Sequence, residues 1–153
     1  MEITASVALT RLGISLLLGV CIGIERQLHK HAAGLRTFTL ICLGSTLAML
    51  VSIYICQTNT ELHNGDPGRI AAQVLTGIGF IGAGLIIKTL DGITGLTTAA
   101  SIFMTAVIGL AIGCGMILVG AVATALTLIV LVSANFVRFR KRKRIKKEKY
   151  NKA

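Results

Sequence analysis

The chain has 153 residues, of which 54% are hydrophobic and only 14% are charged, and its mean hydropathy is +0.79. A soluble domain of this size does not need several long apolar runs in succession, so the composition excludes an ordinary soluble protein and indicates a membrane protein. The net charge of +10 does not predict a nucleic-acid-binding face, because residues 138–153 alone hold ten Lys or Arg against one Glu.

Five apolar runs are long enough, at 1.5 Å per helical residue, to approach or cross a bilayer core. We therefore predict an all-α, polytopic helical membrane bundle of about five transmembrane helices. The expected spans are 4–24, 37–56, 70–88, 92–112 and 115–136. Residues 1–137 form the predicted transmembrane domain, and 138–153 form a basic tail.

The distribution of Lys and Arg predicts the orientation. An odd number of spans places the two termini on opposite sides of the membrane, and short loops rich in Lys and Arg belong in the cytoplasm. The N-terminus is therefore expected outside and the basic tail inside, where it would be attracted to anionic lipid.

The first span contains a charge, Arg11, about two turns inside its apolar run. Such a charge costs a few kcal/mol on insertion scales, so it needs a partner from another span, a backbone carbonyl or a lipid phosphate. Two interpretations stay open: an arginine that reaches the outer headgroups, and a buried structural or gating cation. At the end of the span, Glu25, Arg26 and Arg36 could form an ion-pair cluster, and Gly19-x-x-x-Gly23 predicts close helix packing.

The third span begins at Asp66-Pro67, which is typical of a helix start, and continues through Arg69 and Gln73. It carries four glycines on more than one side, and small residues let membrane helices approach closely, so we predict a central helix packed between neighbours. The glycines are Gly77, Gly79, Gly82 and Gly84. Three of them also match the pattern G-x-G-x-x-G. A dinucleotide site would require a preceding strand and an acidic residue about 20 positions later, and the sequence has neither.

The fourth span carries a polar stripe, because its hydroxyl residues fall within about 100° of one another on a helical projection. They are Thr94, Thr97, Thr98, Ser101 and Thr105. Such hydroxyls bond to carbonyls of their own helix or of a neighbour, or they line a hydrated path or a binding face. Both interpretations stay open.

The chemistry of the spans does not favour catalysis. They contain no His or Asp, and Glu25 lies at a boundary, so we expect no enzyme, no catalytic residue, no cofactor and no metal site. Carboxylates lie only near the ends of the spans, so a single chain is poorly equipped to conduct a divalent cation. A homo-oligomer could nevertheless form the entrance of a pore.

The motifs resemble those of the MgtC/SapB family of inner-membrane proteins over roughly residues 10 to 130. The matching blocks are Gly19-x-x-x-Gly23-Ile24-Glu25-Arg26, Ala33-Gly34-Leu35-Arg36-Thr37, Asp66-Pro67-x-Arg69-Ile70-Ala71-Ala72-Gln73, Gly77-Ile78-Gly79-Phe80-Ile81-Gly82-Ala83-Gly84 and Gly95-Leu96-Thr97-Thr98. Many relatives continue into a C-terminal soluble domain, and we expect this chain to be a short form without it.

The resemblance implies a bacterial inner-membrane protein linked to growth under magnesium limitation and, in pathogens, to survival inside phagocytes. It also implies a regulator of membrane energetics that acts on a membrane protein complex such as the proton-translocating ATP synthase. Carried over by position, the functional residues are Glu25, Arg26, Arg36, Asp66, Arg69, Gln73, Thr97 and Thr98. The alternative is a transporter or channel that uses the threonine stripe beside Gln73 and Arg11.

Overall fold

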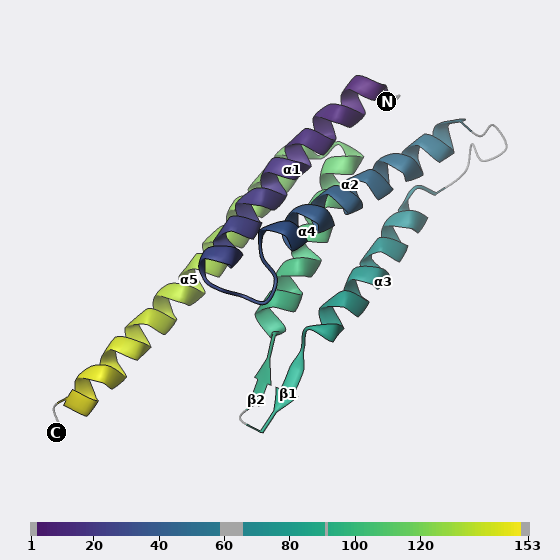
Figure 1. Cartoon of the computed structure of the whole chain (residues 1–153). Coiled ribbons are helices and arrows are strands. Elements are labelled where there is room, and N and C mark those ends of the chain that lie inside the picture. Colours follow the sequence, from purple (N-terminus) through teal and green to yellow (C-terminus); the bar gives the residue numbers. More distant parts are fainter. Residues whose placement is uncertain (1–2, 59–65, 91, 151–153) are drawn as a thin grey trace.

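The structure is a computed structural model that describes residues 3–58, 66–90 and 92–150, with side chains up to Ser133. Five helices and one short hairpin follow one another along the chain (Figure 1). They are α1 (Ala5–Leu28), α2 (Leu35–Thr58), α3 (Gly68–Gly84), β1 (Ile87–Thr89), β2 (Gly92–Thr94), α4 (Leu96–Cys114) and α5 (Ile117–Tyr150). The predicted all-α class is confirmed.

By length and composition, three helices of the described part could cross a membrane: α1, α2 and α4. The apolar part of α5, Ile117–Ser133, is shorter, and α3 has 17 residues. The two ends of the chain lie at opposite ends of the bundle (Figure 1).

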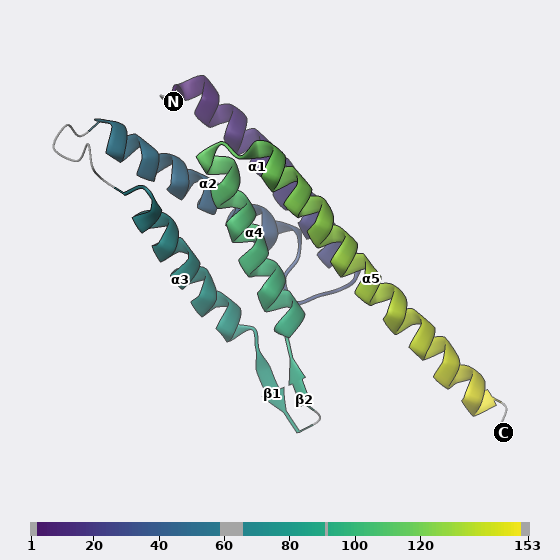
Figure 2. The ribbon, with the colours of Figure 1, turned by 180° about the vertical axis from the view of Figure 1, so that it is seen from behind.

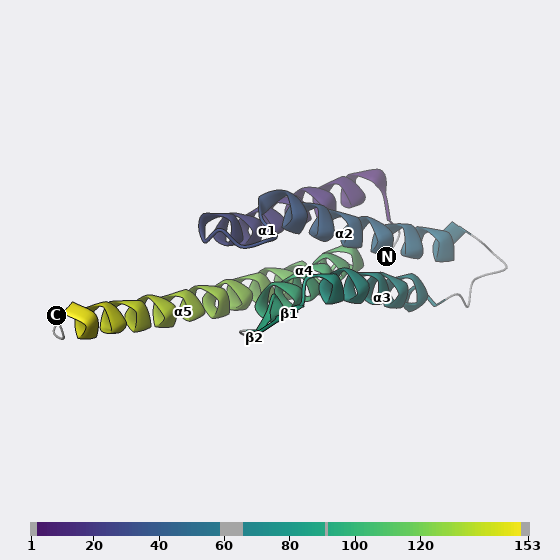
Figure 3. The same ribbon diagram turned by 60° about the horizontal axis from the view of Figure 1, so that its bottom comes forward.

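The helix at the centre of the bundle is α4, which contacts α1, α2, α3 and α5. Figure 2 shows it between α3 and α5, and Figure 3 shows α1 and α2 in a layer over these three helices. Ten of its residues are buried, among them Ile102, Ala106 and Ile112, which join Phe38 and Ile22 in the core.

Glycines set the close approach of α1, α2 and α4. A Cβ added to Gly23 would lie 2.7 Å from Leu35 Cα, so the predicted packing at Gly19 and Gly23 occurs, against α2. On α4, a Cβ at Gly109 would lie 2.5 Å from the Cys42 carbonyl oxygen, and Thr46 Oγ1 donates a 2.8 Å hydrogen bond to the Gly109 carbonyl.

The prediction that α3 is the central helix is wrong. Its buried residues are Ile78 and Gly82, and it contacts α2 and α4 at the edge of the bundle. Of the four glycines, Gly82 packs near Ala99, whereas a Cβ at Gly77, Gly79 or Gly84 would meet nothing within 4 Å among the described residues. Glycine spacing indicates where a backbone can be approached, but not that the neighbour belongs to the same chain.

The third predicted span extends too far at its C-terminal end, and the fourth begins too early, because α3 ends at Gly84 and α4 begins at Leu96. Strands β1 and β2 pair in antiparallel register there, with Lys88 opposite Ile93. Gly92 and Gly95 have φ values of +134° and +89°, which glycine adopts without strain. These backbone conformations are not helical, so α4 cannot extend back through Gly95 and Gly92 toward α3. The fourth span therefore begins at Leu96 and not at residue 92.

At the C-terminal end, α5 continues through the predicted boundary at residue 137 to Tyr150 without a break in the helix. The start of the basic tail is thus a change of composition within one helix. Most of the segment between the second and third predicted spans, residues 57–69, lies outside the described residues.

Candidate functional site

Arg11 is buried between helices, with 6% of the residue exposed. Its Nη1 donates a 2.7 Å hydrogen bond to the carbonyl of Gly113 in the last turn of α4. Carbonyls of a last helical turn have no partner within the helix and carry the negative end of the helix dipole. Of the two interpretations of Arg11, the structure therefore supports the buried structural cation, which caps α4 from α1.

Two further charged residues are buried at the other end of α1. The guanidinium of Arg26 pairs through Nε with Glu25 Oε2, and 1% of Arg26 is exposed. His29 Nδ1 lies 3.2 Å from Glu25 Oε1. The predicted ion-pair cluster thus forms between Glu25 and Arg26, but Arg36 is not part of it, because this residue is exposed on the first turn of α2.

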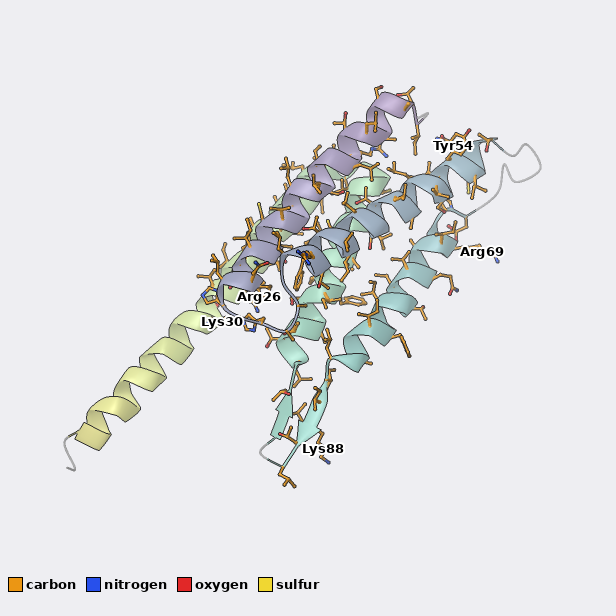
Figure 4. All side chains as sticks on the ribbon, viewed as in Figure 1. Arg26, Lys30, Tyr54, Arg69 and Lys88 are labelled. Carbon is orange, nitrogen blue, oxygen red and sulfur yellow. The ribbon has the colours of Figure 1, made fainter. Side chains whose placement is uncertain are left out.

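Beside this ion pair lies a pocket of about 460 Å³, which we call the polar pocket. It lies between the end of α1, the α1–α2 loop, strand β2 and the first turn of α4, near the labels of Arg26 and Lys30 in Figure 4. Its lining residues are Arg26, His31, Ile93, Thr94, Gly95, Leu96, Thr97 and Thr98. Three predicted site residues, Arg26, Thr97 and Thr98, therefore come together.

A second pocket, of about 370 Å³, lies at the opposite end of the bundle between α2 and α3. It brings together the predicted residues Asp66, Arg69 and Gln73 with Ser52 of α2. Asp66 Oδ1 accepts a 2.7 Å hydrogen bond from the Gly68 amide, which fits the predicted helix start, and Ser52 Oγ donates to the Pro67 carbonyl at 2.8 Å.

The predicted hydroxyl stripe does not lie wholly on α4, because Thr94 belongs to strand β2. Its helical members divide into two parts. Ser101 Oγ and Thr105 Oγ1 donate to carbonyls of their own helix, at 2.9 and 2.8 Å, as the structural interpretation predicted. Thr98 differs: only 6% of it is exposed, and its hydroxyl makes no hydrogen bond to the part of the chain that the structure describes. The side chain of Thr98 lines the polar pocket.

Sequence reasoning missed the residues that complete these arrangements, which include His31, Gly95 and Gly113. Gly95 stands in a quoted motif, and a glycine directly before a hydroxyl-rich helix start is a signal for a left-handed turn. Nothing in the sequence pairs Arg11 with Gly113, 102 positions later, or the α1–α2 loop with α4.

Metal-ligating side chains do not gather at these sites in the described part of the chain. In the ranges 3–58, 66–90 and 92–133, no three or more His, Cys, Asp or Glu side chains gather in a way that could hold a metal ion. Guanidinium groups, hydroxyls and free amides at helix ends bind anions and polar groups rather than cations.

An apolar bundle with buried arginines at both ends of a central helix defines a helical membrane protein with polar sites near its two ends. Comparison with known proteins gives the family. The chain belongs to the MgtC family, whose family model matches residues 12–139. The resemblance seen in the motifs is thereby confirmed.

The chain is 51% identical over 121 residues to the Escherichia coli (strain K12) protein named "Putative magnesium transporter YhiD", covering 78% of this chain and 56% of that protein. It is 40% identical over 132 residues to Protein SapB of Bacillus subtilis (strain 168), covering 84% and 56%. With Protein MgtC of Brucella abortus (strain 2308) it shares 42% identity over 116 residues, covering 74% and 45%. The match thus spans about half the length of these relatives. No solved structure matches the chain.

Proposed function

We propose that this chain is a non-enzymatic protein of the bacterial inner membrane that supports adaptation to low magnesium by binding a partner in the membrane. Its N-terminus faces outward and its basic tail the cytoplasm. The proposal draws on the family and on relatives named for magnesium, and a proton-translocating complex such as the ATP synthase is the partner that the family suggests.

The observation that carries the proposal is the exposed face of α3. Gln73, Gly77, Phe80 and Gly84 follow the spacing i, i+4, i+7, i+11, so they form one stripe along the helix, the α3 stripe. All four are exposed; Phe80 is 83% exposed, and the two glycines leave open space beside it.

This stripe has the composition of a membrane helix interface and not of a lipid-facing surface. Glycines allow a second helix to approach the backbone, Phe80 offers a knob, and the amide of Gln73 gains from a hydrogen bond across helices. We therefore assign the α3 stripe to a transmembrane helix of the partner. Arg36 and Asp66 remain proposed contact residues near the two ends of the bundle.

Replacing Gly77 and Gly84 together with leucine is expected to abolish growth support at low magnesium without loss of folded protein, because the new side chains fill the approach surface but meet nothing in the chain itself. The measurement is growth of bacteria that depend on the introduced gene, with the membrane level of each variant checked. The matched control is the pair Gly13→Leu and Gly44→Leu, two glycines of α1 and α2 that also have open space. Wild-type growth with the α3 variant would refute the assignment.

A transporter is the second candidate. It is favoured by the polar pocket and by the pocket between α2 and α3, which lie near opposite ends of the bundle. The close packing of α2 on α4 at Gly109 argues against a wide path between them. In liposomes that contain the purified protein, we expect no saturable flux of Mg²⁺ and no change of membrane potential. Saturable flux that is lost in Thr98→Leu would overturn the partner-binding proposal.

A further inference from the structure

The first turn of α4 presents unbonded amides to the polar pocket. Gly95, at the N-cap, provides no side chain to accept hydrogen bonds, and the first intrahelical bond runs from the Ala99 amide to the Gly95 carbonyl at 2.9 Å. The amides of Leu96, Thr97 and Thr98 therefore precede the hydrogen-bonded ladder and carry the positive end of the helix dipole.

Two buried side chains of the same pocket also have unused donors. Arg26 bonds to Glu25 through Nε, and its two terminal nitrogens make no hydrogen bond to another described residue, so these nitrogens can reach a ligand in the pocket. The Thr98 hydroxyl, on a side chain that is more than nine-tenths buried, has no partner in the described part of the chain. Both side chains line the same pocket, and polar groups that have no protein acceptor bond to water or to a ligand, so this arrangement points to a ligand that accepts hydrogen bonds.

The charge around the pocket selects an anion. No carboxylate is among the described residues that line it, and Glu25 lies against Arg26 as its ion-pair partner. Lys30, Arg36 and Lys88 belong to the loop, helix start and hairpin at the same end of the bundle, as Figure 4 shows for Lys30 and Lys88. A guanidinium fork beside a helix N-terminus matches the several oxygens of a phosphate better than a single carboxylate.

We propose that the polar pocket binds a phosphate group, held by the terminal nitrogens of Arg26, the Thr98 hydroxyl and the first amides of α4. Glu25 fixes the guanidinium in place from the other side. The phosphate belongs either to the headgroup of an anionic lipid or to a soluble phosphate compound, and the chemistry of recognition is the same for both. This inference does not depend on the α3 stripe or on its partner.

The test uses the full chain, purified in detergent, with three probes. Dioctanoyl phosphatidic acid is titrated and bound copies are counted by native mass spectrometry, with dioctanoylglycerol as the matched lipid without a phosphate. Inorganic phosphate is titrated at constant ionic strength against chloride, and binding is followed by the rise of the melting midpoint, because a ligand of the folded state stabilises it by mass action.

Thr98→Val is the main variant, because it removes one hydroxyl, keeps the shape, and breaks no hydrogen bond between described residues. We expect about a tenfold loss of phosphate affinity, the usual effect of one hydrogen bond to a charged group. Thr105→Val, whose hydroxyl bonds to its own helix, is the matched control and should bind as the wild type. The double variant Glu25→Gln with Arg26→Gln removes both charges together, leaves no buried unpaired charge, and should lose at least a hundredfold.

If the protein binds phosphatidic acid in preference to dioctanoylglycerol, and Thr98→Val weakens this binding, the bound phosphate belongs to a lipid headgroup. Inorganic phosphate bound with the same dependence, and no preference between the lipids, would identify a soluble phosphate. Absence of binding by both phosphate probes, or binding that neither Thr98→Val nor the double variant weakens, would overturn the proposal.

Discussion

Gly109→Val is expected to destabilise the bundle more than any other single substitution considered. The Cβ alone would lie 2.5 Å from the Cys42 carbonyl oxygen and 2.9 Å from Ser45 Cβ, and both neighbours belong to the body of α2. No side-chain rotation relieves a clash with a backbone oxygen, so α2 and α4 must separate. Separation also breaks the hydrogen bond from Thr46 Oγ1 to the Gly109 carbonyl.

The expected loss is about 3 kcal/mol or more, at the upper end of overpacking effects, and it should appear as a lower melting midpoint and a smaller yield of monodisperse protein. Gly44→Val is the control for helix propensity and for hydrophobicity, because Gly44 is a helical glycine of α2 with nothing within 4 Å of an added Cβ. If both variants melt at the same temperature, the α2–α4 contact does not determine stability.

Arg11→Leu is expected to have opposite effects on membrane insertion and on folding. Insertion of the first span should improve, because a charge within an apolar run costs a few kcal/mol. The folded bundle should nevertheless lose about 2 kcal/mol, because the Gly113 carbonyl loses its donor and the end of α4 loses its compensating charge. The measurements are glycosylation-based insertion of the first span and the melting midpoint of the purified protein.

Arg11→Lys is the matched variant for this prediction, because it keeps a cation at the end of α4 but loses the guanidinium fork. It should insert as poorly as the wild type and melt between the wild type and Arg11→Leu. A higher melting midpoint for Arg11→Leu than for the wild type would mean that the buried charge is a net cost, and the capping role would then be wrong.

The sequence predicted the class of the protein and several local contacts well. The length of the apolar runs gave an all-α membrane bundle, Gly19 and Gly23 gave a close contact, and Asp66 gave a helix start. The side chains of Ser101 and Thr105 bond to their own helix, as the structural interpretation of the stripe expected. These features depend on spacing along the chain or on neighbours within one turn.

The tertiary structure decided the central position of α4, the edge position of α3 and the antiparallel pairing of β1 with β2. In a soluble protein the apolar side of a helix faces the core, but lipid is as apolar as a core, so the pattern does not say which side is covered. Gly77 and Gly109 look alike in the sequence, yet one has open space and the other touches α2.

The candidate sites divide in the same way. The residue types at Arg11, Arg26 and Thr98 could be selected from the sequence, because charges and hydroxyls in or beside apolar runs are costly and need partners. Which partners they have was decided by contacts between distant segments: Gly113 for Arg11, and the α1–α2 loop, the hairpin and the start of α4 for the polar pocket. Local spacing therefore determined which residues require a partner, whereas only helix packing, which brings together positions up to 102 residues apart, determined where each partner lies.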